Sequence, residues 1–282
     1  MVIFDMLRRK PDVELVAAHV DHGIREDSYK DEHLVRSVMM SHNVTYETIN
    51  VLLGSKASEE MARKARYDFL RHICDKYNIH TIITAHHQDD LLETVLINML
   101  RGTGWRGLGS LRSTPAILRP LLHVPKADIL QYARAHSIKW REDITNNDQR
   151  YLRNYIRHNL LPRASENWRA AMLQVIVRQS NDIAHIDNET VQWLASNATD
   201  TEAATTLSRY QLTMMPYSVA HELMQTLLRR IIGKSIERPL MQKIVLFCKV
   251  AKSGKVFHLS QTCQLRVTQK DVIVEAVPAV LS

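Results

Sequence analysis

Residues 85–94 read AHHQDDLLET and hold the densest group of chemically versatile side chains in the sequence. Asp90 and Glu93 are three residues apart, so they share one face if this segment is helical. A pair of carboxylates can hold a substrate ammonium group or a metal ion. The structural alternative is that acidic residues cap the free N–H groups of a helix N-terminus, which explains Asp89 more readily than Glu93. We therefore expect a binding site here.

A second polar group, HVDHG at residues 19–23, ends the apolar run VELVAAHV. Two histidines three residues apart with an aspartate between them could be metal ligands, but on a strand-to-loop transition this spacing is not specific. Neither this segment nor the pair His86-His87 shows the HxHxDH spacing of binuclear hydrolases. A metal-dependent hydrolase therefore stays an alternative, and we assign no metal ligands.

Two groups of arginines have spacings that suit phosphate. Arg63 and Arg66 leave one side of a predicted helix, where two guanidiniums could make bidentate bonds to phosphate oxygens. Arg150, Arg153 and Arg157 form a basic stripe with two tyrosines beside it, a pattern typical of RNA contacts. In both cases the alternative is an exposed, solvated helix face.

The charge is unevenly distributed along the chain. The net charge of +7 divides into −4 for residues 1–100, +8 for residues 101–163 and +3 for residues 164–282. A basic block beside an acidic stretch suggests a polyanion-binding surface next to a differently charged pocket. The basic block also contains RGTGWRGLGS, with four of the eight glycines, which could approach a ligand closely or form a flexible loop.

The composition excludes several classes of protein. With 282 residues, of which 45% are hydrophobic and 24% charged, the chain is neither disordered nor collagen-like. No apolar run approaches the roughly 18–20 residues of a membrane span, and the first residues lack the order of a secretory signal. The three cysteines are scattered and form no CxxC pair, so we expect free thiols and a cytoplasmic protein.

Short β-branched runs alternate with helical patterns in the first half of the chain. The expected strands are 13–20, 44–51 and 80–85, and the expected helices nearby are 61–73 and 91–99. This alternation predicts an α/β fold with right-handed crossovers and a parallel sheet covered by helices on both faces. In such sheets the chemistry lies at the carboxyl ends of the strands. Both histidine-containing groups fall at such ends.

The chain begins with an amphipathic pattern at Met1–Arg9 that has no strand before it. After Pro162 the pattern changes to long helices followed by strands, at 168–194, 217–232, 256–259 and 263–277. We therefore predict two domains, an α/β domain at 1–163 and a smaller helical or α+β domain at 164–282.

Five segments together resemble tRNA(Ile)-lysidine synthases, a family of PP-loop ATP pyrophosphatases. They are HVDHGIRE, EEMARKARYDFL, ITAHHQDDLLETVLINMLRGTGWRGL, LRPLLHVPKADI and REDITNNDQRYLRNYIRHNLLP. The match covers residues 13–163 almost continuously, in order and spacing, and is loose over 164–282. The resemblance implies a catalytic domain of the adenine nucleotide alpha-hydrolase type and a C-terminal tRNA-binding domain.

The reaction implied by the resemblance attaches lysine to tRNA. ATP, with Mg²⁺, adenylates the C2 oxygen of the wobble cytidine of tRNA(Ile), and free L-lysine then displaces AMP. No tightly bound cofactor or membrane is implied, and a homodimer stays open. The implied roles are ATP binding for His19, Asp21, His22, Ala85 and His86; catalysis for Arg63 and Arg66; lysine binding for Asp90 and Glu93; and tRNA binding for Arg150, Arg153, Asn154 and Arg157.

One family motif is missing. No SGGxDS phosphate loop occurs in the sequence, although family members carry it after the first strand, before the helix that corresponds to Met1–Arg9. We therefore expect the first strand of the sheet to be absent, and the chain to bind tRNA but to adenylate it weakly. A catalytically inactive tRNA-binding fragment is the leading alternative. A tRNA thiolase would need reactive cysteine pairs, which the sequence lacks.

Overall fold

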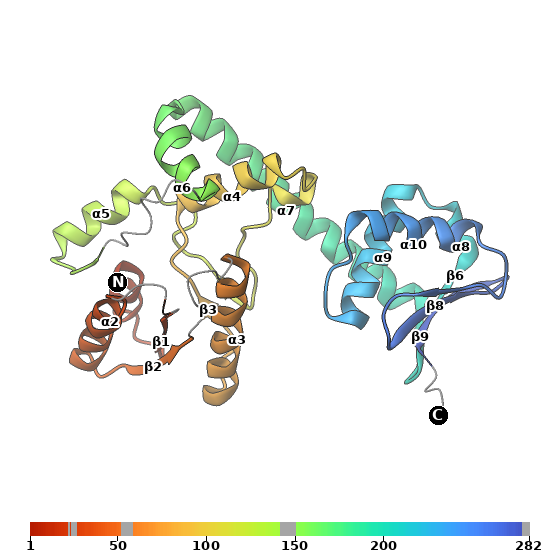
Figure 1. Cartoon of the computed structure of the whole chain (residues 1–282), viewed down its shortest axis with the longest axis horizontal. Helices are drawn as coiled ribbons and strands as arrows, with labels where there is room; N and C mark the ends of the chain where they lie inside the picture. The colour runs from red at the N-terminus through yellow and green to blue at the C-terminus, as the bar shows by residue number, and fades with distance from the viewer. Residues whose placement is uncertain (22, 24–26, 52–58, 142–150, 278–282) are drawn as a thin grey trace. The chain divides into compact units, whose positions relative to one another are not determined.

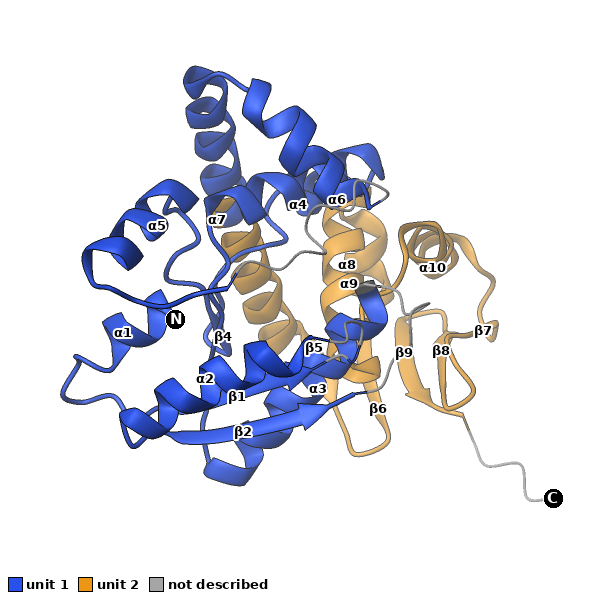
Figure 2. Ribbon diagram, turned by 60° about the vertical axis from the view of Figure 1, so that its left-hand side comes forward, with its two compact units in different colours: residues 1–180 blue, residues 181–282 orange. Residues whose placement is uncertain are grey.

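The computed structural model describes residues 1–21, 23, 27–51, 59–141 and 151–277. The chain divides into two compact units, Met1–Ser180 and Asn181–Ser282 (Figure 2). The division falls inside one long helix, α7 (Glu166–Asn197), which the sequence predicted as one or two helices. The assignment of functional domains at 1–163 and 164–282 stays a prediction.

The first unit alternates helices with short strands (Figure 1). Its elements in chain order are α1 (Val2–Leu7), β1 (Val16–Asp21), α2 (Tyr29–Ser41), β2 (Thr45–Asn50), α3 (Glu59–Tyr77), β3 (Ile82–Ile83), α4 (Gln88–Leu100), the 3-10 turn η1 (Trp105–Gly107), β4 (Ile117–Leu118), α5 (Lys126–Ala135), α6 (Leu152–Tyr155), the π-helical turn η3 (Ile156–Leu160), the 3-10 turn η4 (Leu161–Arg163) and the first half of α7.

The strands of this unit pair in parallel, as the sequence predicted. β1 pairs with β2 from Val16 opposite Thr45 onward, and β3 pairs with β4 with Ile82 opposite Ile117. Helices α2 and α3 both contact β1 and lie on opposite sides of the β1–β2 ladder (Figures 1 and 2). Among the described residues the strands form two separate ladders rather than one continuous sheet. The prediction of helices on both faces is confirmed.

Helix α4 is the central packing element of the first unit. Leu91, Leu92 and Val95 are fully buried, because their spacing of three and four places them on one face of the helix. Ile156 of η3 and Ile176 of α7 belong to the same apolar cluster. The cluster therefore fixes the N-terminal end of α4, where the polar residues lie, against the segments that carry the later arginines.

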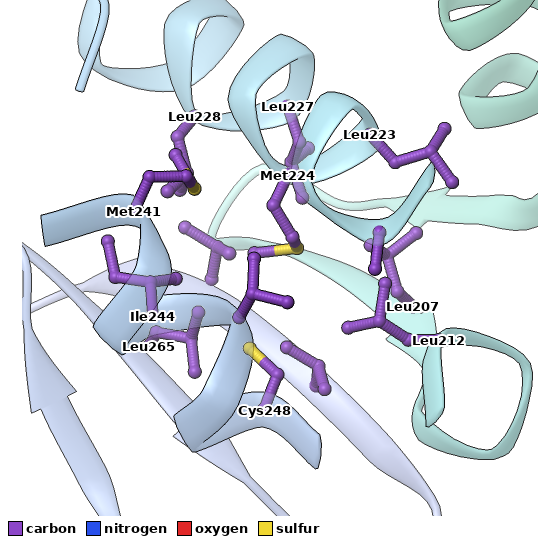
Figure 3. Packing of buried hydrophobic residues seen from close by; sticks show 14 of the residues in the cluster. Leu207, Leu212, Leu223, Met224, Leu227, Leu228, Met241, Ile244, Cys248 and Leu265 are labelled. Atoms are coloured by element: carbon purple, nitrogen blue, oxygen red, sulfur yellow. The ribbon is translucent and has the colours of Figure 1, made fainter. Parts of the chain in front are cut away.

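The second unit is an antiparallel sheet packed against helices. Its elements are the second half of α7, β5 (Ala198–Asp200), β6 (Ala204–Ser208), α8 (Arg209–Met214), α9 (Tyr217–Ile232), α10 (Arg238–Val250), β7 (Val256–His258), β8 (Cys263–Val267) and β9 (Asp271–Ala276). The strand order is β5-β6-β9-β8-β7. Figure 3 shows the buried side chains between sheet and helices, among them Leu223, Met224 and Leu265. The predicted α+β character is confirmed.

Candidate functional site

The carboxyl ends of β3 and β4 hold the first group of predicted site residues. The backbone N–H of Thr84 donates to the carbonyl of Leu118 at 3.0 Å, which keeps the two strand ends together. The Oγ1 of Thr84 lies 2.8 Å from Nδ1 of His86, so the imidazole is oriented by the strand that precedes it. Ala85, between them, is exposed. Both predicted nucleotide contacts of this segment thus lie at a strand end, as expected.

His86 lies in a positively charged surrounding. Burial lowers its pKa to about 4, and the nearby Arg119, Arg63 and Arg66 act in the same direction, whereas Asp90 opposes them. At neutral pH the imidazole is therefore uncharged and can accept or donate a hydrogen bond. Arg63 and Arg66 of α3 both lie near enough to His86 to act on its pKa through their charges.

The acidic residues at the start of α4 have structural partners. The backbone N–H of His87 donates to Oδ2 of Asp90 at 3.0 Å, and the same oxygen lies 3.4 Å from Nε2 of His87. Burial lowers the pKa of His87, so this contact does not depend on a charged imidazole. Asp90 therefore satisfies one of the free N–H groups at the helix start, the structural role that acidic residues have at this position.

Glu93 is fully buried and is bound by Arg157. The Nε of Arg157 donates to Oε1 of Glu93 at 2.6 Å and its Nη2 to Oε2 at 2.9 Å, while the same Nη2 lies 3.3 Å from Oδ1 of Asp90. Burial raises the pKa of Glu93, and the bonds from Arg157 oppose that shift. Burial alone would lower the pKa of Arg157, but the hydrogen bond to Glu93 and the negative charges of Glu93, Asp90 and Asp89 together raise it. The two predicted lysine-binding carboxylates together accept a cation.

The arginines of the predicted basic stripe do not share one exposed helix face. Arg157 turns to the acids of α4, and Asn154 is only 7% exposed. Arg153 is half-buried and acts electrostatically on Glu93. The physical reason is that a buried carboxylate needs a cationic partner, which the sequence spacing alone does not reveal. The exposed residues of this segment include Tyr151 and Tyr155, whereas Arg150 lies outside the described residues.

The carboxyl end of β1 holds the second group of predicted residues. Asp21 is buried and accepts hydrogen bonds from the backbone N–H of Gly23 and the hydroxyl of Ser28, both at 2.9 Å. These two bonds hold Gly23 and Ser28 close to the end of β1. Burial lowers the pKa of His19, against the opposing charges of acids on α2 and of Asp21. His22 lies outside the described residues.

Two arginines near the site were not singled out from the sequence. Arg169 of α7 lies 3.3 Å from Oδ1 of Asp89 and also donates to the carbonyl of Leu161 at 2.6 Å. Arg119, directly after β4, is 6% exposed and lies beside Tyr67 of α3. The only sequence signal for Arg119 was its place in LRPLLHVPKADI, one of the five family segments. No sequence pattern indicated Arg169.

The glycine-rich loop after α4 is ordered by side chains of the protein. Nδ2 of Asn98 donates to the carbonyl of Gly107 at 2.9 Å and to the hydroxyl of Ser110 at 2.8 Å. Gly107 packs so closely that a Cβ there would lie 2.0 Å from Oγ1 of Thr103. Close packing against Thr103 and Asn98 thus explains this glycine without a ligand.

A metal-binding group and a membrane-spanning helix are both absent from the described parts of the chain. No group of three or more His, Cys, Asp or Glu side chains is placed to hold a metal ion there. Likewise, none of the helices between residues 1 and 277 that the structure describes is long and apolar enough to cross a membrane.

Known proteins resemble this chain in both sequence and fold. A tRNA(Ile)-lysidine synthase of Thermotoga sp. (strain RQ2) is 38% identical over 161 residues, which are 55% of this chain and 39% of that protein. Those of Rickettsia felis and Ralstonia nicotianae are 34% and 39% identical over 54% and 51% of this chain. The chain covers only 36% and 33% of these two relatives, so it spans well under two thirds of the curated relatives it matches.

Solved structures also share the fold of this chain. The U34-tRNA thiolase NcsA from Methanococcus maripaludis, with its [4Fe-4S] cluster, superimposes with a TM-score of 0.50 at 14% identity, over 65% of this chain and 68% of that one. At this identity the likeness concerns the fold alone. Residues 1–164 match the PP-loop domain family ATP_bind_3, which is more than half of the chain. This chain therefore belongs to the PP-loop family and has its adenine nucleotide alpha-hydrolase-like fold.

Proposed function

We propose that this chain acts as a tRNA(Ile)-lysidine synthase, an ATP-dependent C–N ligase that acts on tRNA in the cytoplasm. The observation that carries the proposal is the cation bound between Asp90 and Glu93, the guanidinium of Arg157, at a strand end of a PP-loop fold. Relatives at 34–39% identity bear this enzyme's name, which supports the choice of reaction.

The proposed reaction has two steps. The C2 oxygen of the wobble cytidine attacks the α-phosphorus of MgATP, the substrate, and pyrophosphate leaves. The amine of lysine, after losing a proton, then attacks C2, the C2–O bond breaks, and AMP leaves with that oxygen. The product cytidine carries lysine in place of the C2 oxygen.

The nucleotide lies, in this proposal, across the strand ends. His19, Asp21, His22, Ala85 and His86 bind ATP, with His86 acting as an uncharged hydrogen-bonding group because its pKa is about 4. The exposed guanidiniums of Arg63 and Arg66 stabilise the negative charge that develops as pyrophosphate leaves.

Lysine binds, in this proposal, by exchanging with an internal cation. Its ammonium group replaces the guanidinium of Arg157 at Asp90 and Glu93. The bidentate bond from Arg157 to Glu93 supports this exchange, because it means that the carboxylates already bind a cation. The released Arg157, with Arg150 and Arg153, then contacts tRNA phosphates. Asn154, being buried, supports that segment from inside. Residues 164–282 form the rest of the tRNA-binding surface.

The cysteines give no support to a thiol-based reaction such as that of a tRNA thiolase. Burial raises the pKa of Cys248 to about 12, and burial also raises the pKa of Cys263 and of Cys74. A cysteine needs a low pKa to act as a nucleophile at neutral pH. All three thiols are free.

The proposal is tested by following pyrophosphate and AMP separately. The chain, and the same chain extended by a strand and an SGGxDS loop, are each incubated with MgATP and tRNA(Ile), with and without lysine. We expect the extended protein to release pyrophosphate without lysine, and AMP only with lysine. A protein that binds the tRNA but releases neither product in either form would instead be a non-catalytic tRNA-binding protein.

A further inference from the structure

Arg119 is a buried cation to which no acidic side chain of the described residues is paired. Its Nη1 donates to the carbonyl of Arg112 and its Nη2 to the hydroxyl of Tyr67 at 3.4 Å, while Nε has no hydrogen-bond partner within the part of the chain that the structure describes. No carboxylate among the described residues forms an ion pair with this guanidinium, which is only 6% exposed. An arginine cannot lose its proton at ordinary pH, so the protein keeps an uncompensated positive charge here.

The position of Arg119 places this charge beside the strand-end site. The residue before it, Leu118, accepts the backbone N–H of Thr84, whose hydroxyl orients His86. The charged groups that act on His86 are Arg119 after β4, Arg63 and Arg66 of α3, and Asp90 of α4. Three cations and one carboxylate therefore act on the imidazole through their charges. Such an excess of positive charge in a sparsely solvated place favours an anionic ligand.

Tyr67 connects this buried charge to the surface. Its hydroxyl accepts a hydrogen bond from Arg119, and its side chain is 7% exposed. The guanidinium of Arg63 lies over the same ring, 5.0 Å from the centroid, within the usual range of a cation–π contact. Arg63 itself is exposed. The ring that Arg119 holds therefore sets the position of the exposed guanidinium.

We propose that Arg119 is a positioning residue of an anion-binding site at the carboxyl ends of β3 and β4, which takes a phosphoryl group. It fixes Tyr67, and through Tyr67 the contacting residue Arg63, and its own charge adds to the attraction for the anion. The identification of that group as a nucleotide phosphate rests on the proposed function, whereas the anion site itself does not.

Binding of inorganic pyrophosphate, measured by calorimetry on the full chain, tests the site without tRNA or lysine. We expect Arg119→Met to weaken binding about tenfold, the cost of one charged contact. Tyr67→Phe should weaken it by a smaller factor, because the ring remains but its anchor is lost. Arg71→Met is the matched control, since it removes the same charge from the exposed surface of α3 and should leave binding unchanged.

The NMR titration of His86, assigned with His86→Gln, separates the role of Arg119 in this site from a merely structural one. Loss of the Arg119 charge should raise the pKa of His86, whereas Tyr67→Phe should leave it unchanged. Arg119→Lys keeps the charge but not the bond to Tyr67, so it should preserve the His86 titration and still weaken pyrophosphate binding. This variant serves equally if Arg119→Met does not fold.

Two results would overturn the proposal. One is a parent chain that binds no pyrophosphate, and the other is a folded Arg119→Lys or Arg119→Met variant with unchanged binding. Neither result bears on whether the protein joins lysine to tRNA. Conversely, failure to join lysine to tRNA would leave pyrophosphate binding and the His86 titration as expected.

Discussion

Asp90 and Glu93 occupy neighbouring positions on α4 but have different surroundings. The side chain of Asp90 is 15% exposed and shares its oxygens between the helix start and Arg157, whereas that of Glu93 is fully buried. In the proposed lysine site, Asp90 is therefore the carboxylate that an entering ammonium group meets first. Glu93 binds the cation from inside the protein. Because Glu93 is buried, removal of its cationic partner would destabilise the fold.

Substitution of Asp90 separates binding of lysine from helix capping. Asp90→Asn keeps an oxygen that can accept the N–H of His87, so the Tm should change little. The loss of a charged contact should raise the KM for lysine about tenfold or more in the loop-extended enzyme. Steady-state AMP release at varied lysine measures this. Asp89→Asn, which weakens the contact with Arg169, is the control and should keep the parental KM for lysine. An unchanged KM in Asp90→Asn would assign Asp90 to capping alone.

The histidine at the strand end makes stability depend on pH. The pKa of His86 is about 4 in the folded chain against 6.5 ordinarily, so the unfolded chain binds the proton more readily. Stability is then fully present above about pH 6.5 and is lost as the pH falls toward 4, by about 2 kcal/mol at pH 5. Urea unfolding of the parent and of His86→Gln at pH 7 and pH 5 measures this loss. An equal loss in both proteins would contradict the assignment.

The types of residue in the site could be predicted from the sequence, but not all of their contacts. Asp90 and His86 are close in the chain and follow a recognisable strand, so local pattern was sufficient. The bond between Glu93 and Arg157 spans 64 residues, and that between Arg119 and Tyr67 spans 52. Such pairs depend on how elements pack, which periodicity within one element does not contain.

The short helical segment formed by α6 and η3 carries Arg153 and Arg157 to the acids of α4. Ile156, between them, is fully buried in the α4 cluster and so fixes the direction of both arginines. An exposed helix would have left them in solvent. The segment thus links the proposed tRNA-binding residues to the proposed lysine site through packing.

Substitutions in this segment should divide into two classes. Arg150→Ala with Arg153→Ala should weaken tRNA binding and reduce its salt dependence by about one unit of slope for each lost phosphate contact. Arg157→Ala should also destabilise the fold by about 3 kcal/mol, because it leaves Glu93 buried without its partner. Filter binding at several salt concentrations and urea unfolding measure the two effects. A fully stable Arg157→Ala would mean that the bond to Glu93 contributes nothing to the fold.

Periodicity revealed some elements of the chain but not all of them. Helix α9 spans Tyr217–Ile232, the range that its pattern predicted. Strand β2 falls within its predicted run, whereas β1 ends at Asp21, one residue beyond the predicted 13–20. Helix α10 and strands β5 and β6 were not predicted. The two strands are short, whereas α10 has a recognisable helical period, because its buried residues Met241, Ile244, Val245 and Cys248 lie three and four apart.

The described residues form two apolar cores, and α7 contributes to both. Ile176 belongs to the core of the first unit, although it lies beyond the predicted domain boundary at 163. We expect Ile176→Ala to destabilise the first unit by about 2–5 kcal/mol, as for other large apolar side chains removed from a core. Val177→Ala, at a position 41% exposed, is the control and should have little effect. Equal effects on urea unfolding would show that α7 does not complete this core.

In the proposed function, the protein replaces the C2 oxygen of a tRNA cytidine by lysine. This replacement is measured by mass spectrometry of nucleosides from tRNA(Ile) with a CAU anticodon, after incubation with MgATP, lysine and the loop-extended chain. We expect a cytidine heavier by one lysine less one water, found only when ATP and lysine are both present. Unmodified cytidine at the wobble position, in a tRNA that the protein demonstrably binds, would contradict it.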